Sequence, residues 1–145
     1  MFGMFKNKVR KVAGNVKKME NRDAVEASVW GAYAVAFADG NCEPSEIAIL
    51  EKTLAATPAF AGFSGEISQM SSNIRARYEA SPRAANVAAL RELADIAGTP
   101  EAEDVVALCL DIAAQGGEIS EIGEDEMSVL KKIAQALQVQ LEKFF

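Results

Sequence analysis

Residues 37–54, FADGNCEPSEIAILEKTL, decide the fold class, because they connect the end of one apolar helix to the start of another. Gly40 suits the positive φ that commonly terminates a helix. Pro44 is favoured as a first helical residue, and Glu46 lies close to the third position of the helix that Pro44 begins. The stretch therefore predicts a helix over residues 23–38, an acidic turn and a second helix.

The same signals recur along the rest of the chain. Ser81-Pro82 and Thr99-Pro100 each pair a capping residue with a proline, which predicts a helix that starts at each proline. Val87 is expected to face inward from the first of these helices, and the last long helix is expected over residues 124–138. No run of β-branched residues alternates with polar residues between turn signals. We predict an all-α fold, a single compact bundle of about seven to eight helices.

The formal net charge of −6 conceals two regions of opposite sign. Residues 1–19 carry six basic and no acidic side chains, so residues 20–145, with 9 basic and 21 acidic side chains, carry a charge of −12. A length of 145 residues fits one domain of ordinary size. We expect a basic amphipathic N-terminal helix over residues 1–20, called the basic arm below, and a helical domain over residues 21–145.

The basic arm has an apolar stripe at helical spacing, formed by Phe2, Phe5, Val9, Val12, Val16 and Met19. Two interpretations stay open. The stripe packs on the domain or on a partner helix, or residues 1–19 hold the arm on an anionic membrane surface. The acidic remainder of the chain repels nucleic-acid phosphates, so we expect no nucleic-acid partner.

Histidine is absent, and Cys42 and Cys109 belong to no Cys-x-x-Cys pair. This pattern excludes zinc sites of the Cys/His type. The longest uncharged runs have 12 and 13 residues, whereas a bilayer-spanning helix needs about 20. With no signal-peptide pattern, we expect a cytoplasmic protein, which the basic arm would place at the inner face of the membrane if it binds lipid.

Carboxylates gather in two turns, each between an apolar helix and an amphipathic one. The candidate ligands of a divalent cation are Asp39, Glu43 and Glu46 in the first turn, and Glu118 and Glu126 in the second. Oxygen ligands of this kind suit Ca²⁺, Mg²⁺ or Mn²⁺. Neither turn is an EF-hand loop; in the first, Pro44 and Leu50 occupy the positions that require glycine and glutamate.

The same carboxylates also fit a structural role. Acidic side chains in a first helical turn complement the helix dipole and cap free N–H groups, for about 0.3–1 kcal/mol each. Asp39 is the exception, because an acid at the C-terminal end of a helix opposes the dipole. The alternative is a cation that relieves repulsion of about 4 kcal/mol between carboxylates about 4 Å apart at an effective dielectric of about 20.

The order of these elements resembles the TerB family of tellurite-resistance proteins. The resemblance rests on Ala38-Asp39-Gly40, on Glu46 seven residues after the aspartate, and on a second copy that ends in the helix Glu126–Leu137. It implies an all-α domain with an internal pseudo-duplication, acidic residues that bind divalent metal, and complexes with other tellurite-resistance and stress-response proteins, some of them at membranes. The second copy departs from the family pattern, since Gly116 occupies the aspartate position and Glu118 or Asp111 would supply the missing carboxylate.

The expected function is that of a non-catalytic, metal-binding domain in a tellurite-resistance or stress-response system. One alternative is a structural helical interaction module without metal. A carboxylate-metal hydrolase is the enzyme alternative, but the chain has no histidine and no glycine-rich phosphate loop to support it.

Overall fold

Helices account for all regular structure in the part of the chain that the structure, a computed structural model, describes: residues 18–115 and 117–145. This part contains six α-helices, three 3₁₀ helices and no strand, so the all-α prediction is confirmed. The number of α-helices described is smaller than the seven to eight expected. Residues 1–17, which make up most of the basic arm, lie outside the described residues.

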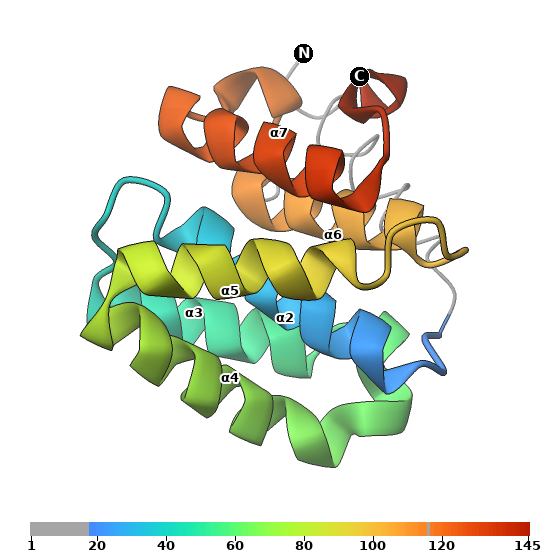
Figure 1. The fold of residues 1–145 in the computed structure, drawn as a ribbon. Coiled ribbons are helices and arrows are strands. Elements are labelled where there is room, and N and C mark those ends of the chain that lie inside the picture. Colours follow the sequence, from blue (N-terminus) through green and yellow to red (C-terminus); the bar gives the residue numbers. More distant parts are fainter. Residues whose placement is uncertain (1–17, 116) are drawn as a thin grey trace.

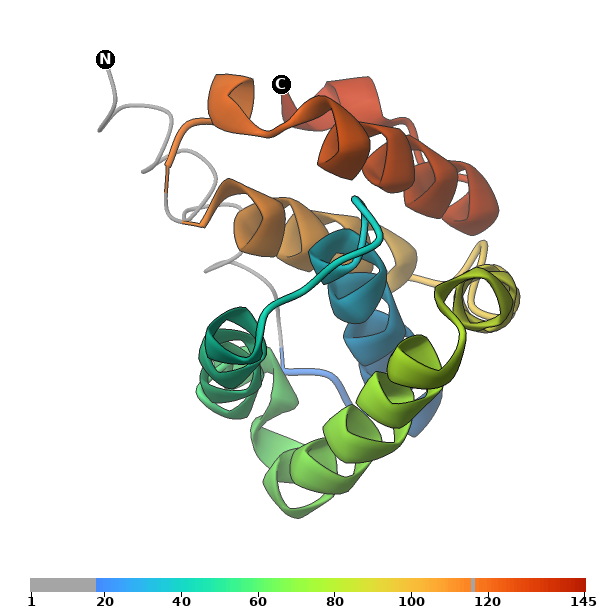
Figure 2. The same cartoon turned by 90° about the vertical axis from the view of Figure 1, so that its left-hand side faces the viewer.

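The elements follow one another with short connections (Figure 1). In chain order they are α2 (Arg22–Ala36), α3 (Pro44–Ala55), η1 (Pro58–Phe63), α4 (Ser64–Ala80), α5 (Pro82–Ala94), α6 (Ala102–Ala114), η2 (Ile119–Glu121), α7 (Glu124–Leu137) and η3 (Leu141–Phe144). Helix α2 is the centre of the packing, because 11 of its 15 residues are buried and it contacts every other α-helix of the described chain. Figure 2 shows α2 near the middle, with the other α-helices arranged around it.

Side-chain caps begin α2 and α5. Asn21 accepts a hydrogen bond from Asp23 N at the start of α2, and Ser81 accepts one from Ala84 N at the start of α5. Gly40 has the predicted positive φ, +83°, but α2 ends at Ala36, two residues earlier than the expected end at Ala38. These contacts satisfy backbone groups that a helix end leaves unpaired.

The predicted helix start at Pro100 is wrong. Helix α6 begins two residues later, at Ala102. Thr99 does not cap α6, because its hydroxyl donates to Ile96 O at 2.7 Å and its N–H also bonds to Ile96 O. Thr99 therefore belongs to the turn that ends the preceding helix.

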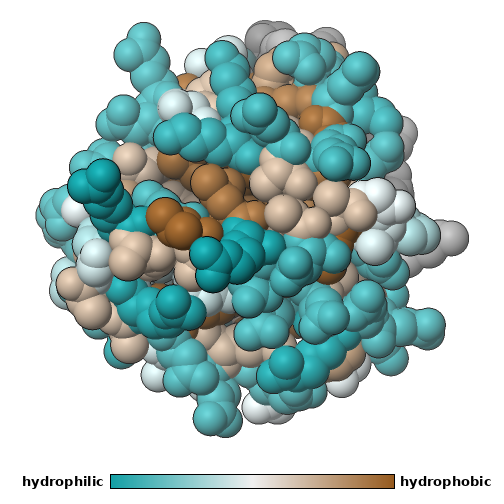
Figure 3. Space-filling view, viewed as in Figure 1, coloured by the Kyte–Doolittle hydropathy of each residue, from teal (hydrophilic) through white to brown (hydrophobic). Residues whose placement is uncertain are grey.

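The prediction that Val87 faces inward is also wrong. The buried stripe of α5 consists of Ala85, Ala89 and Leu93, at the i, i+4, i+8 spacing of one helix face. Val87 lies on another face of α5 and is 56% exposed. Figure 3 shows apolar side chains gathered in a band across the middle of the face that carries α5 and α7, with polar residues on both sides.

One hydrophobic core includes residues from all six α-helices. A smaller cluster of Ala114 and Ile119, with Ile122 and Met127 packed against it, lies where α6 passes into α7. The two acidic turns therefore sit at helix ends on the surface of this core, and α2, the central helix, leads into the first of them.

Candidate functional site

The first acidic turn, residues 37–46, is held in shape by its own side chains. Gly40 provides the positive φ, which glycine adopts without strain. Asp39 Oδ1 accepts a hydrogen bond from Asn41 N at 3.0 Å, which is an Asx-type turn. This bond gives Asp39 a structural role in spite of its unfavourable place after a helix.

Glu43 and Glu46 form a reciprocal capping box at the start of α3. Glu46 Oε1 accepts from Glu43 N at 2.9 Å, and the Glu43 side chain accepts from the backbone of the third helical residue. Asp39 and Glu46 are both exposed, and each uses one carboxylate oxygen in these turn contacts. The second oxygen of each accepts no hydrogen bond from the described residues, so each carboxylate has one oxygen in a turn contact and one available to a ligand.

Cys42 shows that carboxylates gather around this turn. Its thiol is partly buried, and its pKa is raised, first by burial and then by the negative charges of Glu46, Asp39 and Glu79. Glu79 lies near the C-terminal end of α4 and is absent from the sequence-based set of ligands. Nothing in the spacing of Glu79 relates it to the first acidic turn; only the packing of α4 beside α3 does.

The second acidic turn, residues 115–126, also contains a capping box. Its second glutamate is Glu121, whereas the sequence analysis predicted Glu126 as the counterpart of Glu46. Glu121 Oε1 accepts from Glu118 N at 2.9 Å, and Ser120 Oγ donates to Glu118 Oε2 at 3.2 Å. In the resulting Glu-x-x-Glu pattern, Glu121 stands where Glu46 stands in the first turn. The identical spacing of the two pairs was visible in the sequence and could have pointed to Glu121.

Glu126 has a different environment from Glu46. It lies in the first turn of α7, three residues after the N-cap residue Gly123. A Cβ added at Gly123 would collide with the Glu126 carboxylate, so that side chain folds back over the start of its own helix. Among residues 18–115 and 117–145, no three or more Asp, Glu, Cys or His side chains are arranged as a group that could hold a metal ion.

Neither thiol has the environment of an active nucleophile. Burial raises the pKa of Cys109 to about 12, and the pKa of Cys42 is raised as well. Activated cysteines instead have lowered pKa values, because a nearby positive charge or a helix N-terminus stabilises the thiolate. Both thiols therefore stay protonated at neutral pH.

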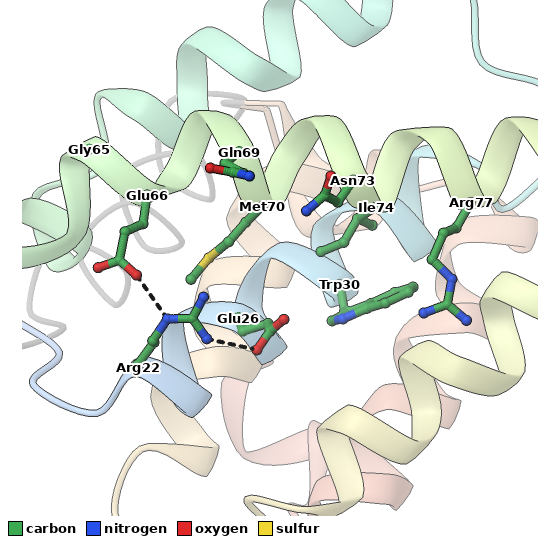
Figure 4. A pocket seen from close by; sticks show the side chains of 10 residues that line it. All are labelled: Arg22, Glu26, Trp30, Gly65, Glu66, Gln69, Met70, Asn73, Ile74 and Arg77. Carbon is green, nitrogen blue, oxygen red and sulfur yellow. Dashed lines mark hydrogen bonds and ion pairs between the residues drawn. The ribbon is translucent and has the colours of Figure 1, made fainter.

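A second candidate site is a groove of about 470 Å³ between α2 and α4, called the α2–α4 groove (Figure 4). Arg22, Glu26 and Trp30 line it from α2, and Glu66 and Arg77 are among the residues that line it from α4. No pattern in the sequence connects these two sets, which come together only because α4 packs along α2.

Comparison of the chain with protein-family models, with curated proteins and with solved structures gave no match in any of the three. The family expected from the acidic turns therefore stays a prediction. In the described part of the chain, no helix combines the length and the apolar character needed to cross a bilayer.

Proposed function

We propose that the chain is a non-catalytic domain of the TerB type that binds a divalent cation at its first acidic turn and acts by contacting other proteins of a tellurite-resistance or stress-response system. The observation that carries the cation part is the geometry of Asp39 and Glu46. One oxygen of each is fixed by a backbone N–H of the turn, and the other is free of hydrogen bonds to the described residues.

A carboxylate held in this way loses little further freedom when it binds a metal ion. Ca²⁺ and Mn²⁺ accept carboxylate oxygens together with several waters, which an exposed turn supplies. A cation at this place would also offset the negative charges of Glu46, Asp39 and Glu79 that act on the Cys42 thiol. These carboxylates are exposed or partly exposed, so we expect a weak site that responds to millimolar rather than nanomolar ion.

The pseudo-duplication that the TerB resemblance implies is part of this proposal. Its support is the pair of capping boxes, Glu43 with Glu46 and Glu118 with Glu121. The first box follows helix α2, and the second follows helix α6. Only the first turn has an aspartate four residues before the box, because Ala114 stands at that distance before Glu118. We therefore assign the cation to the first turn, with Glu118 and Glu126 as structural residues.

A second candidate function is a helical interaction module without metal. The capping boxes favour it, because they explain Glu43, Glu46, Glu118 and Glu121 as groups that satisfy backbone N–H atoms. The protonated thiols and the absence of histidine support a non-catalytic role under both candidates. The basic arm, mostly outside the described residues, is proposed as the contact to a partner or to an anionic membrane surface at the cytoplasmic side.

Conservative substitutions separate the two candidates. Asp39→Asn and Glu46→Gln each keep an oxygen that can accept the turn hydrogen bond but remove the negative charge. We expect both variants to keep the thermal stability of the unmodified protein without metal, and to lose roughly tenfold or more of the affinity for Ca²⁺ or Mn²⁺ in calorimetric titration.

Glu121→Gln is the matched control, because Glu121 has the same capping contact in the second turn. It should leave cation affinity unchanged. Equal loss of affinity in Glu121→Gln and Glu46→Gln, or no saturable heat with Ca²⁺, Mg²⁺ or Mn²⁺ up to millimolar concentration, would leave the module without metal as the better account.

A further inference from the structure

The outer face of α3 carries the most exposed large apolar side chain of the described chain. Ile49 is 66% exposed, more than Val87 or Phe145. It lies outside the buried stripe of its helix, which consists of Ile47, Leu50 and Leu54. Figure 2 shows α3 at the edge of the molecule. Because single exposed apolar residues are common on protein surfaces, the surroundings of Ile49 decide what it can do.

Few charges surround Ile49. Residues 47–65 contain only two charged side chains, Glu51 and Lys52, although 25% of the whole chain is charged. Glu51 is already paired with Arg75 of α4, at 3.3 Å. The other exposed residues on the same side of α3 are small or have one long side chain: Ser45, Ala48, Lys52, Thr53 and Ala56. Small side chains around one large apolar side chain allow a second helix to approach closely.

The two exposed charges beside Ile49 are opposite in sign and equally distant from it. Glu46 lies three residues before Ile49 and Lys52 three residues after it, a rise of about 4.5 Å in each direction. Lys52 forms no ion pair with residues 18–115 or 117–145. Glu46 uses one carboxylate oxygen in the capping box of α3. A second, antiparallel α3 centred on Ile49 would therefore bring each Lys52 level with the Glu46 of the other copy.

We infer that the outer face of α3 binds a second copy of this chain, with the two α3 helices antiparallel about a twofold axis at Ile49. A twofold interface uses the same surface of both copies, so that surface must be complementary to itself. On the axis the two Ile49 side chains pack against each other. On either side of the axis, the flexible four-carbon stem of Lys52 reaches to the Glu46 carboxylate of the other copy.

The exposed face of α5 is not complementary to itself in this way. Arg83 and Arg91 lie four residues on either side of Val87, which is 56% exposed. An antiparallel pair of α5 helices centred on Val87 would place arginine against arginine, which is repulsive. The charges thus favour α3 over α5 as the surface that meets a second copy.

The measurement is sedimentation equilibrium of the full-length protein at a series of concentrations, in a buffer that contains a chelator of divalent cations. A contact of one helix with one helix is small, so we expect a weak dimer with a dissociation constant on the order of 0.1 mM. The average mass should rise from that of the monomer toward that of the dimer between about 10 µM and 1 mM. A protein that stays monomeric over this range overturns the inference.

Ile49→Gln tests the centre of the contact. It should weaken dimerisation by roughly tenfold or more, because each dimer loses the apolar side chain twice. Val87→Gln is the matched control, since it removes the next most exposed large apolar side chain from a face that should not take part. Equal dissociation constants for these two variants would overturn the assignment to α3.

An exchange of charge tests the antiparallel arrangement. Lys52→Glu alone places carboxylates against each other in the dimer, and Glu46→Lys alone places ammonium groups against each other, so each variant should be monomeric. A mixture of the two restores both pairs of opposite charge and should form a dimer. Circular dichroism checks that each variant is folded, because Glu46 also caps α3. A mixture no heavier than its separate components would overturn the antiparallel arrangement.

The dimer and the proposed cation site share Glu46 but can fail separately. Dimerisation is measured in chelator, so it does not depend on a bound cation. Ile49→Gln leaves Asp39 and Glu46 unchanged, and calorimetric titration of this variant with Ca²⁺ or Mn²⁺ tests the cation site in the absence of the dimer.

Discussion

At the scale of single residues, the two tyrosines are buried side chains whose hydroxyl groups form hydrogen bonds to neighbouring polar side chains. Tyr33 shares a 2.5 Å hydrogen bond with Ser71 Oγ between α2 and α4. Tyr78 donates to Asn86 Oδ1 at 2.8 Å. Burial raises the pKa of both phenols above the ordinary value of 10, because the phenolate would lose its hydration inside the protein.

These shifts predict loss of stability in alkaline solution. A raised pKa in the folded state contributes stability that is complete below the unfolded pKa of about 10 and is lost as the pH rises toward the folded pKa. Each tyrosine therefore lowers the free energy of unfolding between pH ~10 and its own folded pKa. The partly buried thiol of Cys42 and the buried thiol of Cys109 act in the same direction, since their pKa values are raised too.

The measurement is the free energy of unfolding in urea between pH 8 and pH 12, with tyrosinate absorbance followed in parallel. Since Tyr33 and Tyr78 are the only tyrosines, absorbance should appear together with unfolding and not before it. Tyrosinate absorbance that rises near pH 10 while the protein remains folded would show that the phenols are not buried as described.

At the scale of helices, the crossing of α2 and α6 depends on a close approach at Gly31. A Cβ placed on Gly31 would lie 2.7 Å from Cys109 Sγ, and Cys109 is fully buried on α6. Glycine is therefore required by the packing of the two helices, although it is unfavourable within a helix by about 1 kcal/mol relative to alanine.

Gly31→Ala should destabilise the protein by about 1–2 kcal/mol, since an overpacking cost of about 1–3 kcal/mol exceeds the gain in helix propensity. Cys109→Ala removes the colliding sulfur, so the double variant should be more stable than the sum of the two single changes predicts. Urea unfolding of the four proteins measures this coupling. Strict additivity would mean that the two helices do not meet at Gly31.

Helix boundaries show how far local signals predict this fold. Ser81-Pro82 and Gly40 are strong signals, and the structure places a cap and a positive φ there. Thr99-Pro100 has the same pattern as Ser81-Pro82, a capping residue before a proline, but the Thr99 hydroxyl donates to Ile96 O in the preceding turn. A capping residue lies between two helices. Its place in the sequence does not show with which of the two its side chain forms a hydrogen bond.

At the scale of the whole molecule, the candidate sites differ in how well sequence could predict them. Asp39 and Glu46 belong to one continuous turn, so their proximity follows from local spacing. Glu79 joins them only through packing of α4 against α3. Arg77 and Trp30 meet across two helices that are far apart in the sequence, and no local pattern relates them.

The distribution of charge adds to this account. The described chain has ion pairs that link separate elements, such as Arg75 with Glu51 at 3.3 Å and Lys143 with Glu103. The first acidic turn has no such pair among the described residues, so no basic side chain of residues 18–115 and 117–145 is paired with Asp39 or Glu46. A cation is the simplest group that would compensate them.

The most direct measurement of the proposed cation site is the NMR spectrum of the labelled protein with small amounts of Mn²⁺, because the paramagnetic ion broadens only the signals close to it. We predict that the amide signals of Asn41, Cys42 and Glu43 disappear first, while those of residues 118–121 remain, and that Asp39→Asn removes the selectivity. Equal broadening at both acidic turns, or none at residues 41–43, would contradict a cation site formed by Asp39 and Glu46.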